Sequence, residues 1–227
     1  MLKFYNSLTN KKETFTPIHR AEVKLYTCGP TVYDKAHIGN FRTFLFEDLL
    51  KRTLLAFGYK VKHIMNITDI DDKTIKKANE SNKNLSQITE HYTKLFFEDS
   101  LSLKILPADN YPLATEHIPG MIEMIKSLIN KKFAYVTEDG SVFFKISSYS
   151  KYGNLTNINM AKMKKSTRVL SDEYNLDSPQ DFALWKAYKN ADGNIFWNSP
   201  WGKGRPGWHI ECSSMSVEYL GKHFDIH

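Results

Sequence analysis

Two cysteines and one histidine are the residues of this 227-residue chain whose types and surroundings are best suited to chemistry. Cys28 directly follows a strand-like run, 22–27, and the only other cysteine, Cys212, lies far along the chain. His37 opens the tetrapeptide His-Ile-Gly-Asn, just ahead of an amphipathic segment. A strand, a loop and an imidazole at a helix start can hold a nucleotide phosphate, because a helix N-terminus offers unpaired N–H groups and a positive field.

The tetrapeptide 37–40 suits phosphate chemistry in two ways. An imidazole donor at His37 can stabilise the charge that develops on a phosphate in a transition state. Gly39 has no side chain, so a nucleotide can approach the backbone there closely. Four residues recur by chance and a lone histidine is often structural, so the motif leaves both interpretations open.

The cysteine pair admits three interpretations: a disulfide, a pair of metal ligands, or two unrelated core residues. A reducing cytosol disfavours the disulfide. A thiolate near a helix N-terminus is more acidic than a free one, and such a thiolate binds zinc. The sequence has no Cys-x-x-Cys, so the spacing does not decide between zinc ligands and core residues.

Two further clusters contain residue types that could bind a metal ion or a phosphate. Asp69, Asp71 and Asp72 could hold a magnesium ion. We prefer the interpretation that Asp71 or Asp72 caps a helix that begins at Lys73, and we assign no metal there. The basic run 162–166, Lys-Met-Lys-Lys-Ser, resembles a phosphate-binding lysine loop. It falls in an insertion away from the expected sheet, so we assign it no role.

The elements that must position these residues follow from hydrophobic spacing. Apolar residues recur at helical intervals from about Gly39 to Phe57, between a strand at 22–27 and a second strand at 59–67. A strand–helix–strand unit of this kind predicts a parallel α/β sheet, which binds ligands at the carboxyl ends of its strands. Cys28 and Thr68 both fall at those ends.

The rest of the chain predicts an insertion into that α/β domain. We expect a Rossmann-type first half at 1–112, a connective insertion at 113–198, and the start of the second half at 199–227. Asp139-Gly140 predicts a tight hairpin with a two-residue turn. The other expected elements follow in chain order: helices over 85–96 and 118–129, a polar loop-rich stretch over 147–178, an apolar segment at 182–185, a turn-rich loop at 201–207 and a helix over 208–220.

Composition narrows the class of protein. The chain is 41% hydrophobic and 25% charged, as in soluble globular proteins. We find no apolar run of about 18 residues and no signal peptide, which predicts a cytoplasmic protein without a membrane anchor. The net charge of +6 permits a polyanionic partner but does not demonstrate one, because the lysines are scattered.

Taken together, five segments closely resemble the cysteinyl-tRNA synthetases, a family of class I aminoacyl-tRNA synthetases. They are 26–34, 37–44, 66–73, 114–118 and 204–213, in order along nearly the whole chain. The resemblance implies a Rossmann-type catalytic domain with a connective insertion. It also implies ATP-dependent formation of cysteinyl-adenylate, with Mg²⁺, and transfer of cysteine to the 3′ end of tRNA(Cys) by a monomeric enzyme.

The resemblance also implies roles for individual residues. Cys28 and Cys212 match two of the family's zinc ligands, and His37 and Asn40 match catalytic positions. The remaining matches are Pro30, Thr31, His37, Gly39 and Asn40 for ATP, and Gly29, Thr68 and Trp208 for the amino acid.

Zinc makes chemical sense in such an enzyme. Serine differs from cysteine by one atom, and shape discriminates so small a change by only about 1–3 kcal/mol. An error rate of one in 10⁴ needs roughly 5.5 kcal/mol. Bonding of the substrate thiolate to a metal with one open position can supply the difference, because a hydroxyl competes poorly for it.

The chain departs from the family pattern at its end. The family's other zinc ligands, a His and a Glu, come just beyond His227, as do its Lys-Met-Ser-Lys-Ser loop and its anticodon-binding domain. We therefore expect a front half with little or no charging activity alone, and we do not assign His209 or His227 to zinc. Two rivals stay open. One is a cysteine ligase of the mycothiol pathway, which has an amino-sugar acceptor; the other is a non-catalytic truncated paralogue that binds RNA or cysteine.

Overall fold

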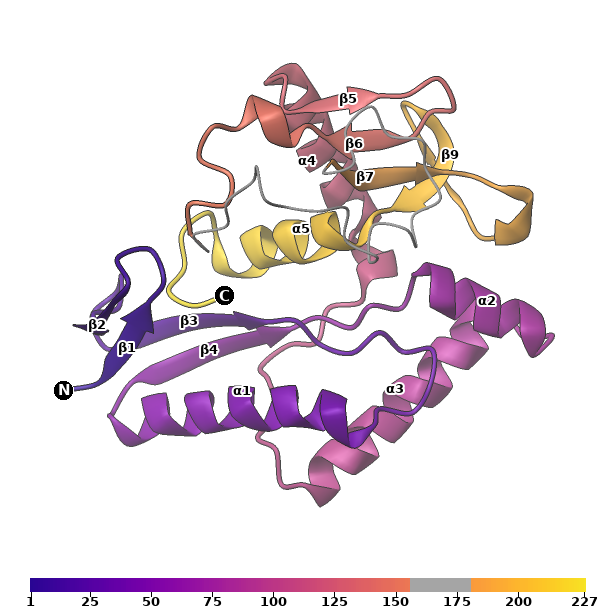
Figure 1. Cartoon of the computed structure of the whole chain (residues 1–227). Helices are drawn as coiled ribbons and strands as arrows, with labels where there is room; N and C mark the ends of the chain where they lie inside the picture. The colour runs from indigo at the N-terminus through magenta and orange to yellow at the C-terminus, as the bar shows by residue number, and fades with distance from the viewer. Residues whose placement is uncertain (156–180) are drawn as a thin grey trace.

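The computed structural model describes residues 1–155 and 181–227, and it is organised around a pair of parallel strands (Figure 1). Strands β3 (Glu22–Thr27) and β4 (Lys60–Met65) pair in parallel from Glu22↔Lys60 to Thr27↔Met65, and α1 (Ile38–Ala56) connects them. Single parallel bridges widen this pair, Leu25↔Ile226 on one side and Ile64↔Asn110 on the other. The predicted Rossmann-type α/β arrangement is confirmed.

The helices that follow the parallel pair along the chain begin within one residue of the predicted positions. A short hairpin of β1 (Lys3–Asn6) and β2 (Lys11–Thr14) precedes it. Asp71 caps the next helix, as expected, because its carboxylate accepts the N–H of Lys73 at 2.9 Å. The elements after β4 are α2 (Asp72–Glu80), α3 (Leu85–Ser102), the 3₁₀ turn η1 (Ala114–His117) and α4 (Ile118–Asn130).

A five-stranded antiparallel sheet forms the second layer, with strand order β5-β6-β7-β9-β8. The basic run 162–166 and most of the polar stretch 147–178 lie outside the described residues. The bounds are β5 (Ala134–Val136), β6 (Val142–Phe144), η2 (Ile146–Ser148), β7 (Phe182–Ala187), η5 (Asn190–Asp192), β8 (Trp197–Ser199), β9 (Gly202–Pro206) and α5 (Trp208–Leu220).

The prediction of a turn-rich loop at 201–207 is wrong. Most of this segment is strand β9, which pairs with both β7 and β8. Gly204 on β9, and Gly207 just after this strand, allow close packing against β7. A Cβ on Gly204 would lie 2.3 Å from the carbonyl oxygen of Lys186, and one on Gly207 would lie 2.0 Å from that of Ala183. Glycine here serves the close approach of two strands.

The hairpin of β5 and β6 is confirmed, but its predicted two-residue turn is wrong. Only Gly140 has a positive φ, +87°, whereas a type I′ turn needs one at both central residues. The Thr137 N–H donates to the Ser141 carbonyl at 2.9 Å, and the Gly140 N–H donates to the Thr137 carbonyl at 3.0 Å. The connection is therefore a three-residue loop ending in a left-handed glycine.

Helix α5 lies between the two layers, with the parallel strands on one side and the antiparallel sheet on the other (Figure 1). One buried cluster includes Tyr26 and Ile64 from the parallel pair, Trp185 from β7, and Met215 from α5. A charge cluster reinforces the junction: Asp72 pairs with Lys186 at 2.7 Å and also with Arg205. The core thus fixes α5 against the carboxyl end of β3.

No helix within residues 1–155 and 181–227 combines the length and the apolar character needed to cross a bilayer.

A buried histidine makes the stability of this fold depend on pH. His63 on β4 is 2% exposed, and its Nε2 lies 2.9 Å from the Thr27 hydroxyl oxygen. Burial, and after it the charge of Lys51, lower its pKa to about 4 from an ordinary 6.5. Between those values the unfolded chain binds more protons than the folded one, so the free energy of unfolding falls as the pH falls. His63 is expected to remove about 3 kcal/mol by pH 4.

Urea unfolding at pH 7 and pH 4 measures this loss of stability. The variant His63→Gln keeps a polar partner for Thr27 but cannot titrate, so it should lose markedly less stability on acidification than the unmodified chain. Equal losses in the two proteins would show that His63 does not carry the pH dependence.

Candidate functional site

The two cysteines meet at the carboxyl end of β3. Cys28 is the first residue after that strand, and Cys212 lies on the second turn of α5. Their Sγ atoms are 3.4 Å apart, although 184 positions separate them in sequence, and both thiols are free. Cys212 is buried and Cys28 is exposed, so the pair has one protected and one accessible sulfur.

The two thiols differ in acidity. The hydrogen bond from Cys212, followed by one from His227, lowers the pKa of Cys28. The same hydrogen bond to Cys28, together with burial, raises the pKa of Cys212. The pair therefore favours one thiolate, on Cys28, beside the remaining thiol of Cys212.

This donor pair fits half of a zinc site. Two sulfurs bound at about 2.3 Å to a tetrahedral zinc ion lie roughly 3.8 Å apart, so the observed 3.4 Å needs only a small opening. Thiolates are also the soft ligands that zinc prefers. Across residues 1–155 and 181–227, no group of three His, Cys, Asp or Glu side chains could hold a metal ion.

Gly29 and Thr68, the positions expected to bind the amino acid, lie next to the sulfur pair. A Cβ on Gly29 would fall 1.8 Å from the backbone oxygen of Asn66, so only glycine fits where the two strand ends approach. The Thr68 N–H donates to the carbonyl of Pro30 at 3.0 Å, and Thr31 forms a parallel bridge with Thr68. The loop expected to bind ATP thus runs directly alongside the expected amino-acid position.

A buried polar network underlies these residues, and sequence reasoning gave it no role. Asn66 accepts from the Gly29 N–H at 3.3 Å and from the Cys212 thiol at 3.6 Å. Its amide nitrogen donates to the Thr68 hydroxyl at 3.1 Å, and that hydroxyl donates to Glu211 at 3.0 Å. The available signal was positional, because Asn66 follows β4 directly, as Cys28 follows β3.

Glu211 is the carboxyl group of this network, and only 1% of its surface is exposed. Burial raises its pKa well above the ordinary value, and the nearby carboxylates Asp71 and Asp69 act in the same direction. The hydrogen bond from Thr68 and the charge of Arg205 oppose that shift. The net effect is that the carboxyl group behind Thr68 loses its proton less readily than an ordinary glutamate.

His37, Gly39 and Asn40 form a second group, at the first turn of α1. His37 is the N-cap residue: its Nδ1 accepts the Gly39 N–H at 3.0 Å, while the Asn40 side chain accepts the His37 N–H at 3.1 Å. An accepting Nδ1 places the proton of a neutral imidazole on Nε2, which becomes a donor. The exposed ring at a helix N-terminus can therefore donate to an anion.

Trp208, the remaining expected amino-acid position, is the first residue of α5. It is 56% exposed, and its ring lies 5.3 Å from that of His209. Residues four apart on a helix share a face, so Trp208 lies one turn from Cys212 on the same side of α5.

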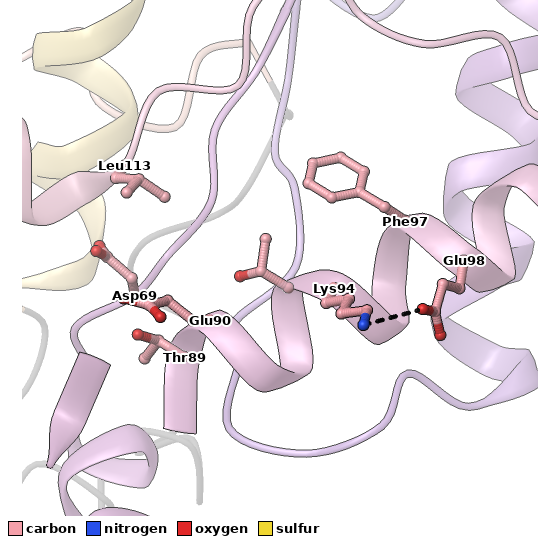
Figure 2. A pocket seen from close by; sticks show the side chains of 8 residues that line it. Asp69, Thr89, Glu90, Lys94, Phe97, Glu98 and Leu113 are labelled. Atoms are coloured by element: carbon pink, nitrogen blue, oxygen red, sulfur yellow. Dashed lines mark ion pairs between the residues drawn. The ribbon is translucent and has the colours of Figure 1, made fainter. Parts of the chain in front are cut away.

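A cavity of about 430 Å³ lies elsewhere, beside α3 (Figure 2). Its walls contain none of the expected site residues. The Asp69 carboxylate that lines it is already occupied, because it accepts from the Thr115 backbone N–H at 2.9 Å and from the Thr115 hydroxyl. The lining residues are Asp69, Thr89, Glu90, Thr93, Lys94, Phe97, Glu98 and Leu113.

Comparison with known proteins gives close relatives along the whole chain. Residues 14–227 match the family described as tRNA synthetases class I (C) catalytic domain. The cysteine–tRNA ligases of Chlamydia felis and Chlamydia pneumoniae are 55% and 53% identical over all 227 residues, which cover 48% of each. That of Brachyspira hyodysenteriae is 54% identical over 226 residues, 99% of this chain and 48% of its own. The chain spans about half the length of these curated relatives.

A solved structure shares the fold. Methionyl-tRNA synthetase of Mycobacterium tuberculosis, in complex with methionyl-adenylate, aligns with a TM-score of 0.63 over 88% of this chain and 47% of its own. The sequence identity is 12%, so this likeness concerns the fold alone.

Proposed function

Because the chain belongs to the family of class I tRNA synthetase (C) catalytic domains, whose cysteine–tRNA ligases it matches at 53–56% identity, we propose that the protein activates L-cysteine with ATP and transfers it to tRNA(Cys). The observation that carries the proposal is the sulfur pair: two Sγ atoms 3.4 Å apart, in a chain of contacts with the Gly29–Thr31 loop and Thr68.

Each group of site residues has a part in this reaction. Cys28 and Cys212 hold zinc, which when bound offers a position that prefers a thiolate over a hydroxyl group. Gly29, Thr68 and Trp208 surround the amino acid. Pro30, Thr31 and Gly39 bind ATP with its Mg²⁺, and His37 and Asn40 act on the phosphate through the positive end of α1.

The proposal extends to the organisation of the protein. We infer a monomer in the cytoplasm, and a division into a first catalytic half at 1–112, an insertion at 113–198 and a second half beginning at 199. Strand β9 adds residues 202–206 to the antiparallel sheet from beyond the second boundary.

Residues 1–227 alone should charge tRNA little or not at all, because they span about half of each relative. Robust charging by them would contradict this.

Exchange of pyrophosphate into ATP tests the proposed function. The full-length gene product should exchange pyrophosphate when L-cysteine is present, and serine should support this roughly 10⁴-fold less well if zinc supplies the discrimination. A non-catalytic protein that only binds cysteine or RNA would show no exchange, and this result would contradict the proposed function.

The acceptor is tested separately. Supplied with ATP, labelled cysteine and each acceptor in turn, the protein should label tRNA. Label on an amino sugar alone would instead assign it to the cysteine ligases of the mycothiol pathway. The basic charge of the chain, +6, favours the tRNA.

A further inference from the structure

The hydroxyl group of Tyr26 is a buried donor without an acceptor. Tyr26 lies on β3, and none of its surface is exposed. Within residues 1–155 and 181–227 its hydroxyl oxygen has no hydrogen-bond partner. A buried tyrosine hydroxyl usually finds a partner, because leaving a buried polar group unpaired costs free energy. An exception of this kind calls for an explanation in the site that the side chain faces.

The side chain of Tyr26 faces the sulfur pair. Side chains alternate along a strand, so Tyr26 and Cys28, two positions apart, lie on the same side of the chain. Thr27 between them faces the other way, where its hydroxyl lies 2.9 Å from the His63 ring. Tyr26 packs in one buried cluster with Cys212 of α5. The unpaired hydroxyl is therefore on the side of the sheet where α5 brings its cysteine.

This hydroxyl favours the form of Cys212 that binds a metal. The hydrogen bond to Cys28 and burial raise the pKa of Cys212, whereas the Tyr26 hydroxyl lowers it. A cysteine binds zinc as a thiolate, so its sulfur gives up the proton and can then only accept. The Asn66 oxygen, which accepts from the thiol at 3.6 Å, has no proton to offer a thiolate. The O–H group of Tyr26 does have one.

We propose that Tyr26 is a positioning residue of the zinc site: its hydroxyl donates to the thiolate of Cys212 and holds that sulfur in place beside Cys28. This inference rests on the proposed function, because it assigns the two sulfurs to zinc. The ring that carries the hydroxyl is itself held, since its centroid lies 5.2 Å from that of the His227 ring, in an edge-on contact. Groups that orient metal ligands typically contribute about 10- to 100-fold to metal affinity.

Tyr26→Phe tests the hydroxyl alone, because it keeps the ring and its packing. The full-length gene product is freed of metal with a chelator and titrated with Co²⁺, and the variant should bind Co²⁺ about 10- to 100-fold less tightly. Its thiolate-to-Co²⁺ charge-transfer absorption should also move to longer wavelength, because a sulfur that loses a hydrogen bond holds its electrons less tightly. Without metal the variant should be as stable as the unmodified protein, since the lost hydroxyl is unpaired in the part of the chain that the structure describes.

Tyr111→Phe is the matched control, because it makes the same chemical change away from the sulfurs. The Tyr111 hydroxyl accepts the Ala108 N–H at 2.8 Å, in the segment between α3 and η1. Removing it breaks an existing hydrogen bond, so Tyr111→Phe should lower the stability of the protein. It should leave the Co²⁺ affinity and the wavelength of the absorption unchanged.

The outcomes separate this inference from the proposed function. Unchanged Co²⁺ affinity in Tyr26→Phe would overturn the inference, and so would a lower affinity with an unmoved absorption, which would indicate packing alone. A Tyr26→Phe protein that does not fold would also contradict it, because the hydroxyl would then serve the fold without metal. Each of these results leaves the proposed function intact.

Two results in the unmodified protein concern the proposed function itself. Absence of thiolate absorption with Co²⁺ would refute the assignment of the sulfurs to zinc, and the inference with it. Absence of cysteine-dependent pyrophosphate exchange would refute the proposed function, while the comparison of Co²⁺ binding between Tyr26→Phe and the unmodified protein would still be valid.

Discussion

Cys28→Ser is expected to lower the zinc content of the protein and its rate of cysteine activation together. The activation rate should fall by more than about 100-fold, because changes that touch only the surroundings of a metal site already cost about 10- to 100-fold. The physical reason is the loss of the accessible sulfur of the pair, which lies 3.4 Å from Cys212. Elemental analysis and pyrophosphate exchange on the same preparation measure the two effects.

Cys212→Ser serves as the companion variant. The two sulfurs act as a unit in this account, so the double variant should be no worse than either single one, which is the non-additivity expected of residues in contact. Circular dichroism checks that each variant folds. Full zinc content in Cys28→Ser would remove Cys28 from the ligand set.

His37→Ala is expected to slow cysteine-dependent pyrophosphate exchange by about 10²- to 10³-fold, the usual loss when one donor to a developing charge is removed. The same change deletes the N-cap of α1, where Nδ1 accepts the Gly39 N–H at 3.0 Å. Loss of a cap costs about 1 kcal/mol of stability. Exchange kinetics and thermal unfolding follow the two effects separately.

His37→Asn distinguishes catalysis from capping. Asparagine is among the preferred N-cap residues, so this variant should keep nearly the unmodified stability. Its shorter amide does not replace the imidazole donor, so the exchange rate should remain low. Normal exchange in His37→Asn would mean that position 37 serves only to begin the helix.

Local sequence patterns correctly predicted the elements whose structure depends on interactions between neighbouring residues. Strand Glu22–Thr27 and helix Trp208–Leu220 have the predicted bounds, and Asp71 caps α2 as expected. Hydrophobic spacing and capping chemistry are properties of neighbouring residues, so a single sequence contains them. The family resemblance then related the two distant cysteines, which no spacing rule links.

Contacts between distant segments were not predictable in the same way. The glycines of β9 are typical of a loop until β7 and β8 pair with that strand. Asn66 was part of a recognised motif, but its role depends on Gly29, Cys212 and Thr68, which only the folded chain places around it. Buried polar networks of this kind need the tertiary structure to be seen.

X-ray absorption at the zinc edge tests the central claim most directly, because it counts the sulfur atoms around the ion. In zinc-loaded protein we expect two sulfurs at about 2.3 Å, contributed by Cys28 and Cys212, and one more when L-cysteine is bound. A coordination shell of nitrogen and oxygen alone, or one that keeps both sulfurs in Cys28→Ser, would contradict the account.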